Sequence, residues 1–503
     1  MSFVAELEPR PLWQHFDELL TIPRPSKHEE RARGYVIRVA ERKGLRHRED
    51  AVGNVVVEKP ASPGKEGAPT VVLQAHLDMV TEKNAGTAHD FDRDPIVPRR
   101  DGDWVKATGT TLGADNGIGA ATLLAVLEAD DLVHGPLELL FTVDEETGLT
   151  GALDLDPAAL GLTGRLLLNL DSEEEGSVTI GCAGGSTSRL TLSLESAPAP
   201  SGTAALDVRL SGLKGGHSGM EIHLQRGNAS KLLARVLFAA AQQTPFHLAS
   251  FSGGNKHNAI PREAAARVVV PAASRDAFQA AAEQEVAAIA AEIRPADPDV
   301  KLEIADVVED APRRVWTIAA SRRALDLLNA LPHGVLTMSY DIAGLVETST
   351  NLATVTSAED SLTVLMSTRS SVASGMRATR RRLRAIAELA GAELAETEGY
   401  PGWKPDLASP LLARFQQVHH RLTGKDAEVL AVHAGLECGI LREKLPGMHA
   451  ISFGPVITGA HSPDEGVKID SVGRFWELLK AVLGELAGAE DRRTDQTNAV
   501  HQP

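Results

Sequence analysis

Three hydrophobic segments of the chain each run directly into acidic residues. TVVLQA (70–75) is followed by His76-Leu77-Asp78, LLFTV (139–143) by Asp144-Glu145-Glu146, and LLLNL (166–170) by Asp171. Carboxylates that converge on one place repel one another and raise one another's pKa unless a cation neutralises them. A single acid after a strand is ordinary protein surface, but three such endings favour a metal site.

His76 and Asp78 have a spacing that suits a metal ligand and the group that orients it. On an extended chain, residues two apart point to the same side. Histidine is a common neutral ligand for zinc, and a carboxylate on its other ring nitrogen fixes the tautomer. Taken alone, the pair is a weak signal, because it is more typical of a surface histidine that is capped or held by a salt bridge.

The remaining acids divide into two kinds of role. Asp115 lies in GADNG, which is also a good turn or helix-cap sequence. At the rim of a sheet its two oxygens could bridge two cations about 3.5–4 Å apart. Glu145 and Glu146 are neighbours and would point apart, so that one binds metal and the other transfers protons.

The elements around these residues predict an α/β fold. Short apolar runs alternate with helical patterns from Trp13 to Leu170 and again from residue 449 to 486, which indicates a mostly parallel central sheet with helices on both faces. Ligands bind at the carboxyl ends of the strands in such a sheet. Segments 188–195 and 205–213 alternate with period two instead, as antiparallel strands do.

We therefore predict a catalytic metal-binding domain interrupted by an inserted α+β lid. The first part of the catalytic domain covers residues 1–186 and the second part 398–490. The lid, which would bind substrate, covers 187–397. The last stretch, 491–503, is expected to be a disordered tail.

Composition excludes several classes of function. The 503 residues carry a net charge of −17, which disfavours nucleic acid and anionic membrane surfaces as partners. Two cysteines cannot form a cysteine-rich zinc site, so a metal must use His, Asp and Glu. Neither a secretory signal nor a long apolar span is found, and we expect a cytoplasmic protein.

Together these motifs resemble a known family. QAHLDMV (74–80), TTLGADNGIG (110–119), FTVDEETGLTGA (141–152), LNLDSEEEG (168–176), LKGGHSG (213–219) and HSPDE (461–465) occur in the order found in the dizinc aminopeptidase/carboxypeptidase-like metallopeptidases. NLDSEEEG, GLKGGHSG and KHNAIPRE (256–263) are most similar to the aminoacyl-histidine dipeptidase (cytosol non-specific dipeptidase) branch.

The resemblance implies roles for particular residues. Two Zn²⁺ ions, replaceable by Co²⁺ or Mn²⁺, would be held by five ligands: His76 and Asp171 on one, Glu146 and His461 on the other, and Asp115 on both. Asp78 would orient His76, and Glu145 would be the general base. His217, Asn258, Arg369 and Gly435 would contact the substrate, with His217 also acting in catalysis by stabilising the oxyanion. The resemblance further implies a cis Asp115–Asn116 peptide.

The function implied is hydrolysis of unblocked dipeptides, including Xaa-His, with broad N-terminal specificity. Relatives of this kind are often homodimers, so a homodimer is possible. Two other hydrolases remain open on the same scaffold, a metal-dependent N-acyl-amino-acid deacylase and a tripeptidase. A non-catalytic peptide-binding protein would also keep the fold, but we would then expect a missing ligand or base.

Overall fold

A computed structural model describes residues 2–397 and 399–488 and divides the chain into two compact units. The first unit contains the described residues up to Gly181, then Pro405–Ala431, and those from Leu436 onward. The second contains Cys182–Lys404 and the short return segment Val432–Gly435. The segment predicted as a lid, 187–397, falls inside the second unit. The predicted tail at 491–503 lies outside the described residues.

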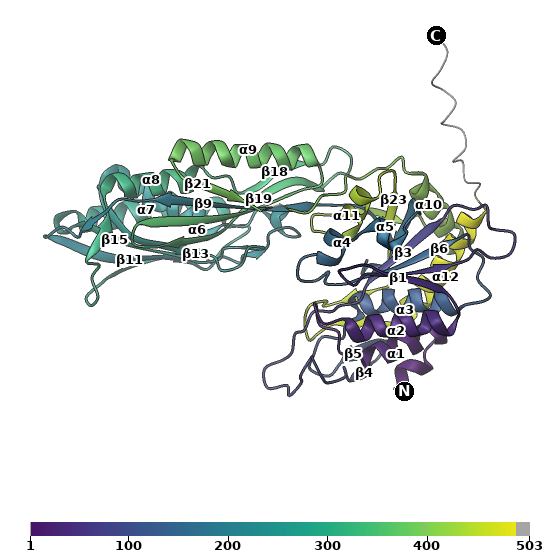
Figure 1. Cartoon of the computed structure of the whole chain (residues 1–503). Coiled ribbons are helices and arrows are strands. Elements are labelled where there is room, and N and C mark those ends of the chain that lie inside the picture. Colours follow the sequence, from purple (N-terminus) through teal and green to yellow (C-terminus); the bar gives the residue numbers. More distant parts are fainter. Residues whose placement is uncertain (1, 398, 489–503) are drawn as a thin grey trace, which may run out of the picture. The chain divides into compact units, whose positions relative to one another are not determined.

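An eight-stranded sheet forms the centre of the first unit (Figure 1). Its order is β1-β2-β6-β3-β7-β23-β8-β22. The four inner strands β6, β3, β7 and β23 are parallel, whereas β1 is antiparallel to β2, β2 to β6 and β8 to β23. The mostly parallel sheet predicted from the apolar runs is thus confirmed, with antiparallel edges added. The strands are β1 Arg46–Glu49, β2 Val55–Lys59, β3 Val71–His76, β6 Leu137–Thr142, β7 Leu166–Asn169, β8 Ser177–Cys182, β22 Glu428–Val432 and β23 His449–Ser452.

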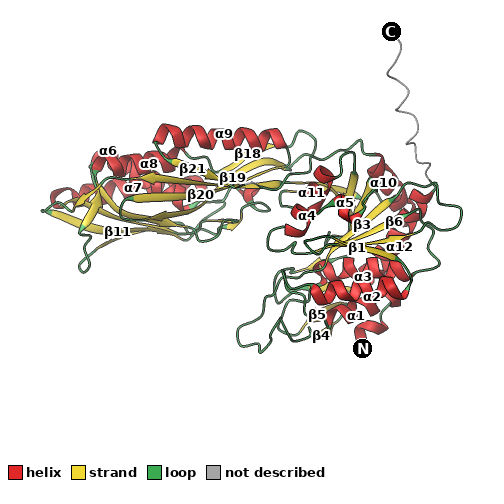
Figure 2. Cartoon of the chain, viewed as in Figure 1, coloured by secondary structure: helices red, strands yellow, loops and turns green. Residues whose placement is uncertain are grey.

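Helices cover both faces of this sheet, which is why every residue of β3 and β6 is buried. In the view of Figures 1 and 2, α1, α2 and α3 lie on one side of the sheet and α4, α10 and α11 on the other. The helices are α1 Arg10–Leu20, α2 Glu30–Arg42, α3 Ala114–Glu128, α4 Thr150–Asp154, α5 Pro157–Leu160, α10 Pro410–Thr423, α11 Glu437–Lys444 and α12 Ile469–Ala487. A small second sheet, in the order β24-β25-β5-β4, joins Ile457–Thr458, Gly466–Lys468, Trp104–Ala107 and Pro98–Asp101.

A nine-stranded antiparallel sheet forms the second unit, as the period-two segments predicted. Its path is β16-β11-β15-β13-β19-β20-β9-β21, and β18 pairs with β19. Alternate strand residues join the helices in one hydrophobic cluster that includes Val208, Leu237, Phe278, Leu325 and Leu383. The strands are β9 Gly184–Ser193, β11 Thr203–Ser211, β13 His247–Gly253, β15 Ala264–Pro271, β16 Lys301–Asp306, β18 Gly334–Met338, β19 Val346–Ser357, β20 Ser361–Ser370 and β21 Glu393–Glu396. The helices are α6 Ala229–Gln243, α7 Arg275–Ile293, α8 Ile318–Ala330 and α9 Ala373–Ala390.

Two short ladders complete the second unit. β10 (Ser196–Pro198) pairs with β17 (Arg314–Trp316), and β12 (Gly216–His217) pairs with β14 (Ala259–Ile260). The second ladder positions predicted site residues.

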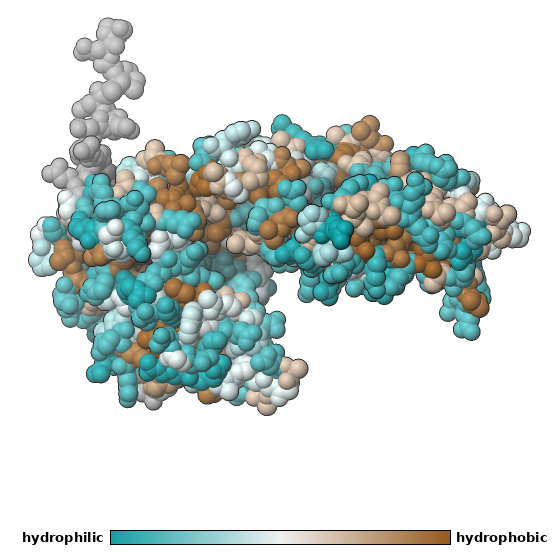
Figure 3. All heavy atoms as spheres, turned by 180° about the vertical axis from the view of Figure 1, so that it is seen from behind, coloured by the Kyte–Doolittle hydropathy of each residue, from teal (hydrophilic) through white to brown (hydrophobic). Residues whose placement is uncertain are grey.

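The face of the molecule seen in Figure 3 is mainly hydrophilic. Figure 3 shows hydrophilic residues over most of the visible face, with hydrophobic residues in small groups between them. Of the helices within residues 2–397 and 399–488, none combines the length and the hydrophobicity that spanning a bilayer requires.

Candidate metal centre and a second polar cluster

The parallel register of three strands brings the predicted ligands to one edge of the sheet. His76 is the last residue of β3 and lies beside Thr142, the last residue of β6. Gln74 of β3 lies beside Asn169, the last residue of β7. The segments that follow, with the acids of 144–146 and Asp171, therefore leave the sheet at the same edge.

Asp115 lies between two histidines at this edge. Its Oδ1 is 3.3 Å from His76 Nε2, and its Oδ2 is 3.2 Å from His461 Nε2. Asp171 Oδ1 is 3.4 Å from the same nitrogen of His76, and Glu146 Oε2 is 2.9 Å from that of His461. The five predicted ligands thus form two groups that share Asp115, and each group has donor atoms within 4.8 Å of one another. The Asp115–Asn116 peptide is cis, as the resemblance implied.

The donor atoms fit divalent metal ions. Asp78 Oδ1 lies 3.2 Å from His76 Nδ1 and would hold the proton of a neutral imidazole there, so that Nε2, which faces Asp115 and Asp171, is the nitrogen available to a metal. The second oxygen of Glu146, Oε1, is buried and has no hydrogen-bond partner within the described part of the chain. Imidazole nitrogen together with carboxylate oxygen is a donor set that zinc accepts. The residues therefore constitute a candidate metal-binding group.

Asp78 also fixes the two glutamates. Its side chain is fully buried and accepts hydrogen bonds from the backbone N–H groups of Glu145, at 3.0 Å, and Glu146, at 3.1 Å. Ser26 donates a further bond of 2.7 Å. One carboxylate therefore sets the orientation of His76 and the start of the acidic segment together. Although burial would raise it, these bonds and His76 hold the pKa of Asp78 at about 2.

The pKa values of the side chains at this edge show how closely the acidic residues lie to one another. Burial, together with neighbouring carboxylates, raises the pKa of Asp171 to about 7 and that of Glu145 well above its ordinary value. The hydrogen bonds to Asp115 and Glu146 raise the pKa of His461 to about 11. The raised pKa values of Asp171 and Glu145 favour their neutral, protonated forms, and a bound cation would offset their negative charge in place of those protons.

A buried polar network lies beneath the ligands, and the sequence analysis missed it. Glu437 accepts hydrogen bonds from Gln74 Nε2, at 2.5 Å, and Thr142 Oγ1, at 2.8 Å, and Asn169 Nδ2 donates to Gln74 Oε1 at 2.5 Å. Burial raises the pKa of Glu437 to about 8. A usable signal was present, because Gln74 and Asn169 interrupt apolar runs at positions where buried strands normally carry hydrophobic side chains.

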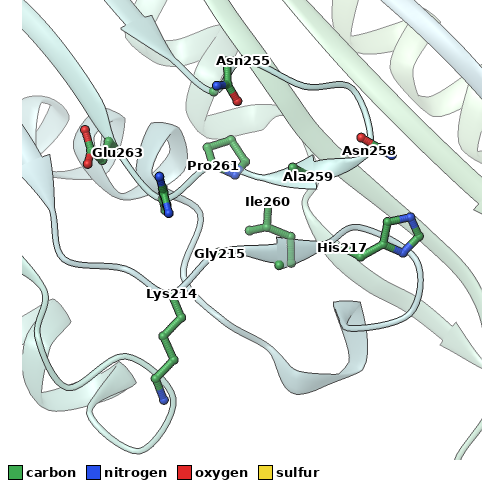
Figure 4. Close-up of a pocket in the computed structure, with 12 residues that line it drawn as sticks. Lys214, Gly215, His217, Asn255, Asn258, Ala259, Ile260, Pro261 and Glu263 are labelled. Carbon is green, nitrogen blue, oxygen red and sulfur yellow. The ribbon is translucent and has the colours of Figure 1, made fainter. Parts of the chain in front are cut away.

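In the second unit, the β12–β14 ladder brings His217 and Asn258 together. His217 pairs with Ala259 in the ladder, and the backbone N–H of Ser218 donates to the Asn258 carbonyl at 2.8 Å. Both residues line a cavity of about 580 Å³ and lie at one end of it, while Lys214 and Glu263 lie at the other (Figure 4).

Two glycines allow Arg369 to approach this pair. A Cβ on Gly219 would lie 2.3 Å from the His433 carbonyl oxygen and 3.1 Å from both Arg369 Nε and His217 Cε1. A Cβ on Gly435 would lie 2.9 Å from the ring of Tyr400, whose hydroxyl accepts a hydrogen bond of 3.3 Å from Arg369 Nη1. The four residues predicted to contact substrate are thus gathered within the second unit. Tyr400 and His433 belong to the same cluster and were not predicted.

His217 is a neutral hydrogen-bond donor in this cluster. Its Nδ1 accepts the backbone N–H of Met220 at 3.0 Å, which leaves the ring proton on Nε2. Burial, and next the charge of Arg369, lower the pKa of His217. The buried Arg369 Nε lacks a hydrogen-bond partner among the described residues.

The known proteins that this chain resembles are peptidases. Residues 72–485 match peptidase family M20/M25/M40. The chain is 44% identical to the cytosol non-specific dipeptidase of Escherichia coli (strain K12), over 97% of this chain and 99% of that protein. The crystal structure of an aminoacylhistidine dipeptidase from Vibrio alginolyticus is 46% identical, with a TM-score of 0.88 over 96% of this chain and 98% of the other. A tripeptidase from Staphylococcus aureus shares the fold at 15% identity and a TM-score of 0.55, over 96% of this chain and 100% of that one.

Proposed function

Since this chain belongs to peptidase family M20/M25/M40, we propose that it is a dinuclear metal dipeptidase that hydrolyses unblocked dipeptides. The observation that carries the proposal is the carboxylate of Asp115, which presents one oxygen to the group of His76 and the other to that of His461. The similarity to the Escherichia coli and Vibrio dipeptidases over nearly their whole length supports dipeptides, including Xaa-His, as substrates with broad N-terminal specificity.

The metals proposed are two Zn²⁺ ions, for which Co²⁺ or Mn²⁺ would substitute. His76 and Asp171 would hold one ion, Glu146 and His461 the other, and Asp115 both. When bound, such ions polarise a carbonyl group and make a water molecule more acidic.

The side chains of the first unit would manage the proton. Glu145 would remove a proton from the attacking water and return it to the leaving amine. Asp78 would orient His76 and the backbone of 145–146, and would thereby fix the position of the metal ligand relative to the base.

The cluster in the second unit would bind the dipeptide. His217, with its proton on Nε2, would donate to the substrate carbonyl oxygen as negative charge develops there. Arg369 would pair with the free C-terminal carboxylate through guanidinium N–H groups such as Nε, for which the described residues offer no partner. Asn258 and Gly435 would line the same subsite, Asn258 by hydrogen bonding and Gly435 by leaving space beside Tyr400.

The test is a substrate panel at controlled metal loading. The protein is stripped with a chelator, reloaded with zinc and assayed on Xaa-His and other dipeptides, tripeptides and N-acetyl amino acids, with bound metal measured by elemental analysis. We expect activity only with metal and mainly on dipeptides. Preference for N-acetyl amino acids or tripeptides would replace the dipeptidase assignment with one of those hydrolases. Absence of bound metal and of turnover would favour a peptide-binding protein.

Two further proposals concern the setting of the enzyme. The name of the Escherichia coli relative supports a cytoplasmic location. A homodimer is the second proposal, and sedimentation of the zinc-loaded protein tests it.

A further inference from the structure

The loop that carries Asp115 is held by one buried carboxylate from a distant segment. Glu465, 2% exposed, accepts hydrogen bonds from four successive backbone N–H groups. Its Oε2 bonds to Leu112, at 2.7 Å, and Gly113, at 2.8 Å, and its Oε1 to Ala114, at 2.7 Å, and Asp115, at 3.2 Å. Both oxygens are therefore occupied, and Glu465 is not free to act as a ligand.

Arg24 holds the same loop from the other side. It is also 2% exposed, and its Nη2 donates to the Gly113 carbonyl at 2.5 Å. Its Nη1 donates to the carbonyls of Leu77, at 2.9 Å, and Asp78, at 3.1 Å. A Cβ on Gly113 or Gly117 would lie 2.6 Å from Nη2, so that glycine at both positions leaves room for the guanidinium group.

These two side chains connect three segments that each carry a proposed metal ligand. Arg24 connects the end of β3, which carries His76, to the loop of Asp115. Glu465 lies four residues after His461 and connects that segment to the same loop. Charge complements the geometry, because the buried guanidinium faces the carboxylates of Glu465, Asp78 and Asp115.

We propose that Arg24 and Glu465 are positioning residues that hold Asp115 between His76 and His461, so that its two oxygens serve two metal ions. This inference rests on the proposed dinuclear site. A negative charge is required at residue 465, because four N–H dipoles converge on it and an amide would turn its own N–H₂ group toward some of them. Groups that orient metal ligands in this way typically contribute about 10–100-fold to metal affinity or activity.

The experiment compares zinc binding in wild type, Glu465→Gln, Arg24→Lys and the control Glu138→Gln. Glu138 is 6% exposed and accepts the backbone N–H groups of Thr163 and Gly164, both at 3.0 Å. It lies in the same unit near the start of β6, away from the edge that carries the ligands. Each metal-free protein is titrated with zinc against a chelating dye, and its melting temperature is measured with and without zinc. Arg24→Lys keeps the buried charge and so serves if Glu465→Gln does not fold.

We expect about 10–100-fold weaker zinc binding in Glu465→Gln and Arg24→Lys, together with a smaller rise in melting temperature on adding zinc. Their kcat should fall at limiting zinc while KM changes little. Glu138→Gln should melt earlier with and without zinc by the same amount and should keep wild-type zinc affinity.

The outcomes separate the inference from the function on which it rests. Wild-type zinc affinity and an unchanged zinc-dependent rise in melting temperature in both variants would overturn the inference alone. A wild-type protein that binds no zinc would overturn the proposed function and the inference with it.

Discussion

The two polar clusters of this protein are built from opposite kinds of side chain. In the first unit, four carboxylates and two imidazoles meet at the edge of a parallel sheet, and most of their orientation comes from backbone N–H groups and buried hydrogen bonds. In the second unit, an arginine, histidines and a tyrosine gather around a two-residue ladder. The first composition suits cations and the second an anion or a carbonyl oxygen.

The clusters also differ in how firmly their members are held. Asp78 uses both oxygens in four hydrogen bonds, whereas Arg369 makes one bond to Tyr400 and leaves Nε without a partner among the described residues. A rigid acidic site and an incompletely paired basic site are expected to respond differently to substitution. Changes in the first should alter metal content or chemistry, and changes in the second should alter the use of substrate.

The sharpest contrast within the first cluster is between adjacent glutamates. We expect Glu145→Gln to lower kcat by about 10²–10⁴-fold, since it removes the proposed base, while both zinc ions remain bound. Glu146→Gln, its matched control, should lose zinc, because Glu146 lies 2.9 Å from His461 and is a proposed ligand. Elemental analysis and kcat measured on the same preparations decide this. Wild-type turnover in Glu145→Gln would remove it from the role of base.

His217→Ala tests whether the second cluster takes part in the chemistry. Loss of a donor to the developing oxyanion should lower kcat by about 10²–10³-fold without changing zinc content. His247→Ala is the control, because His247 lies in the same unit and its Nδ1 bonds to the Trp316 carbonyl, at 2.8 Å, outside the cluster. An unchanged kcat in His217→Ala would mean that His217 has a structural role and no catalytic one.

Arg369→Gln should affect recognition more than turnover. We expect KM for dipeptides to rise by about 10–100-fold, since a hydrogen bond to a charged group contributes roughly 1.5–3 kcal/mol. For dipeptides with an amidated C-terminus, the substitution should raise KM much less. Arg267→Gln, which breaks an exposed pair with Asp207, should leave KM unchanged. An equal rise in KM for free and amidated dipeptides would argue against a subsite for the carboxylate.

Most of the first cluster could be predicted because the ends of the strands can be recognised in the sequence. Apolar runs located β3, β6 and β7, and the acids that follow them could meet only at one edge of a parallel sheet. The small sheet β24-β25-β5-β4 was not predicted, since strands of two to four residues carry too little periodicity.

Contacts between distant segments were the part that could not be predicted. Glu465 follows His461 in a loop, and nothing local shows that its carboxylate binds amides at 112–115. Tyr400 and His433 likewise come near Arg369 through tertiary contacts, Tyr400 by a hydrogen bond and His433 by packing at Gly219. Single polar residues without a periodic pattern give no signal of this kind, whereas Gln74 in a buried strand did.

His433 offers the smallest and most specific contrast, through pH. Burial, and next the charge of Arg369, lower its pKa to about 3. Its Nε2 lies 2.7 Å from Ser349 Oγ. Histidine in the unfolded chain has a pKa near 6.5, so below that pH the unfolded chain takes up a proton that the folded chain refuses. The stability that His433 contributes is therefore fully present above about pH 6.5 and decreases as the pH falls toward 3, with a loss of about 2 kcal/mol between pH 7 and pH 5.

Urea unfolding at these two pH values tests this contribution. Between pH 7 and pH 5, the free energy of unfolding should fall by about 2 kcal/mol less in His433→Asn than in wild type. His333, whose burial lowers its pKa to about 4, contributes equally to wild type and variant and cancels in the comparison. An identical pH dependence in both proteins would mean that His433 is not held neutral, and that the second cluster tolerates more positive charge than its packing indicates.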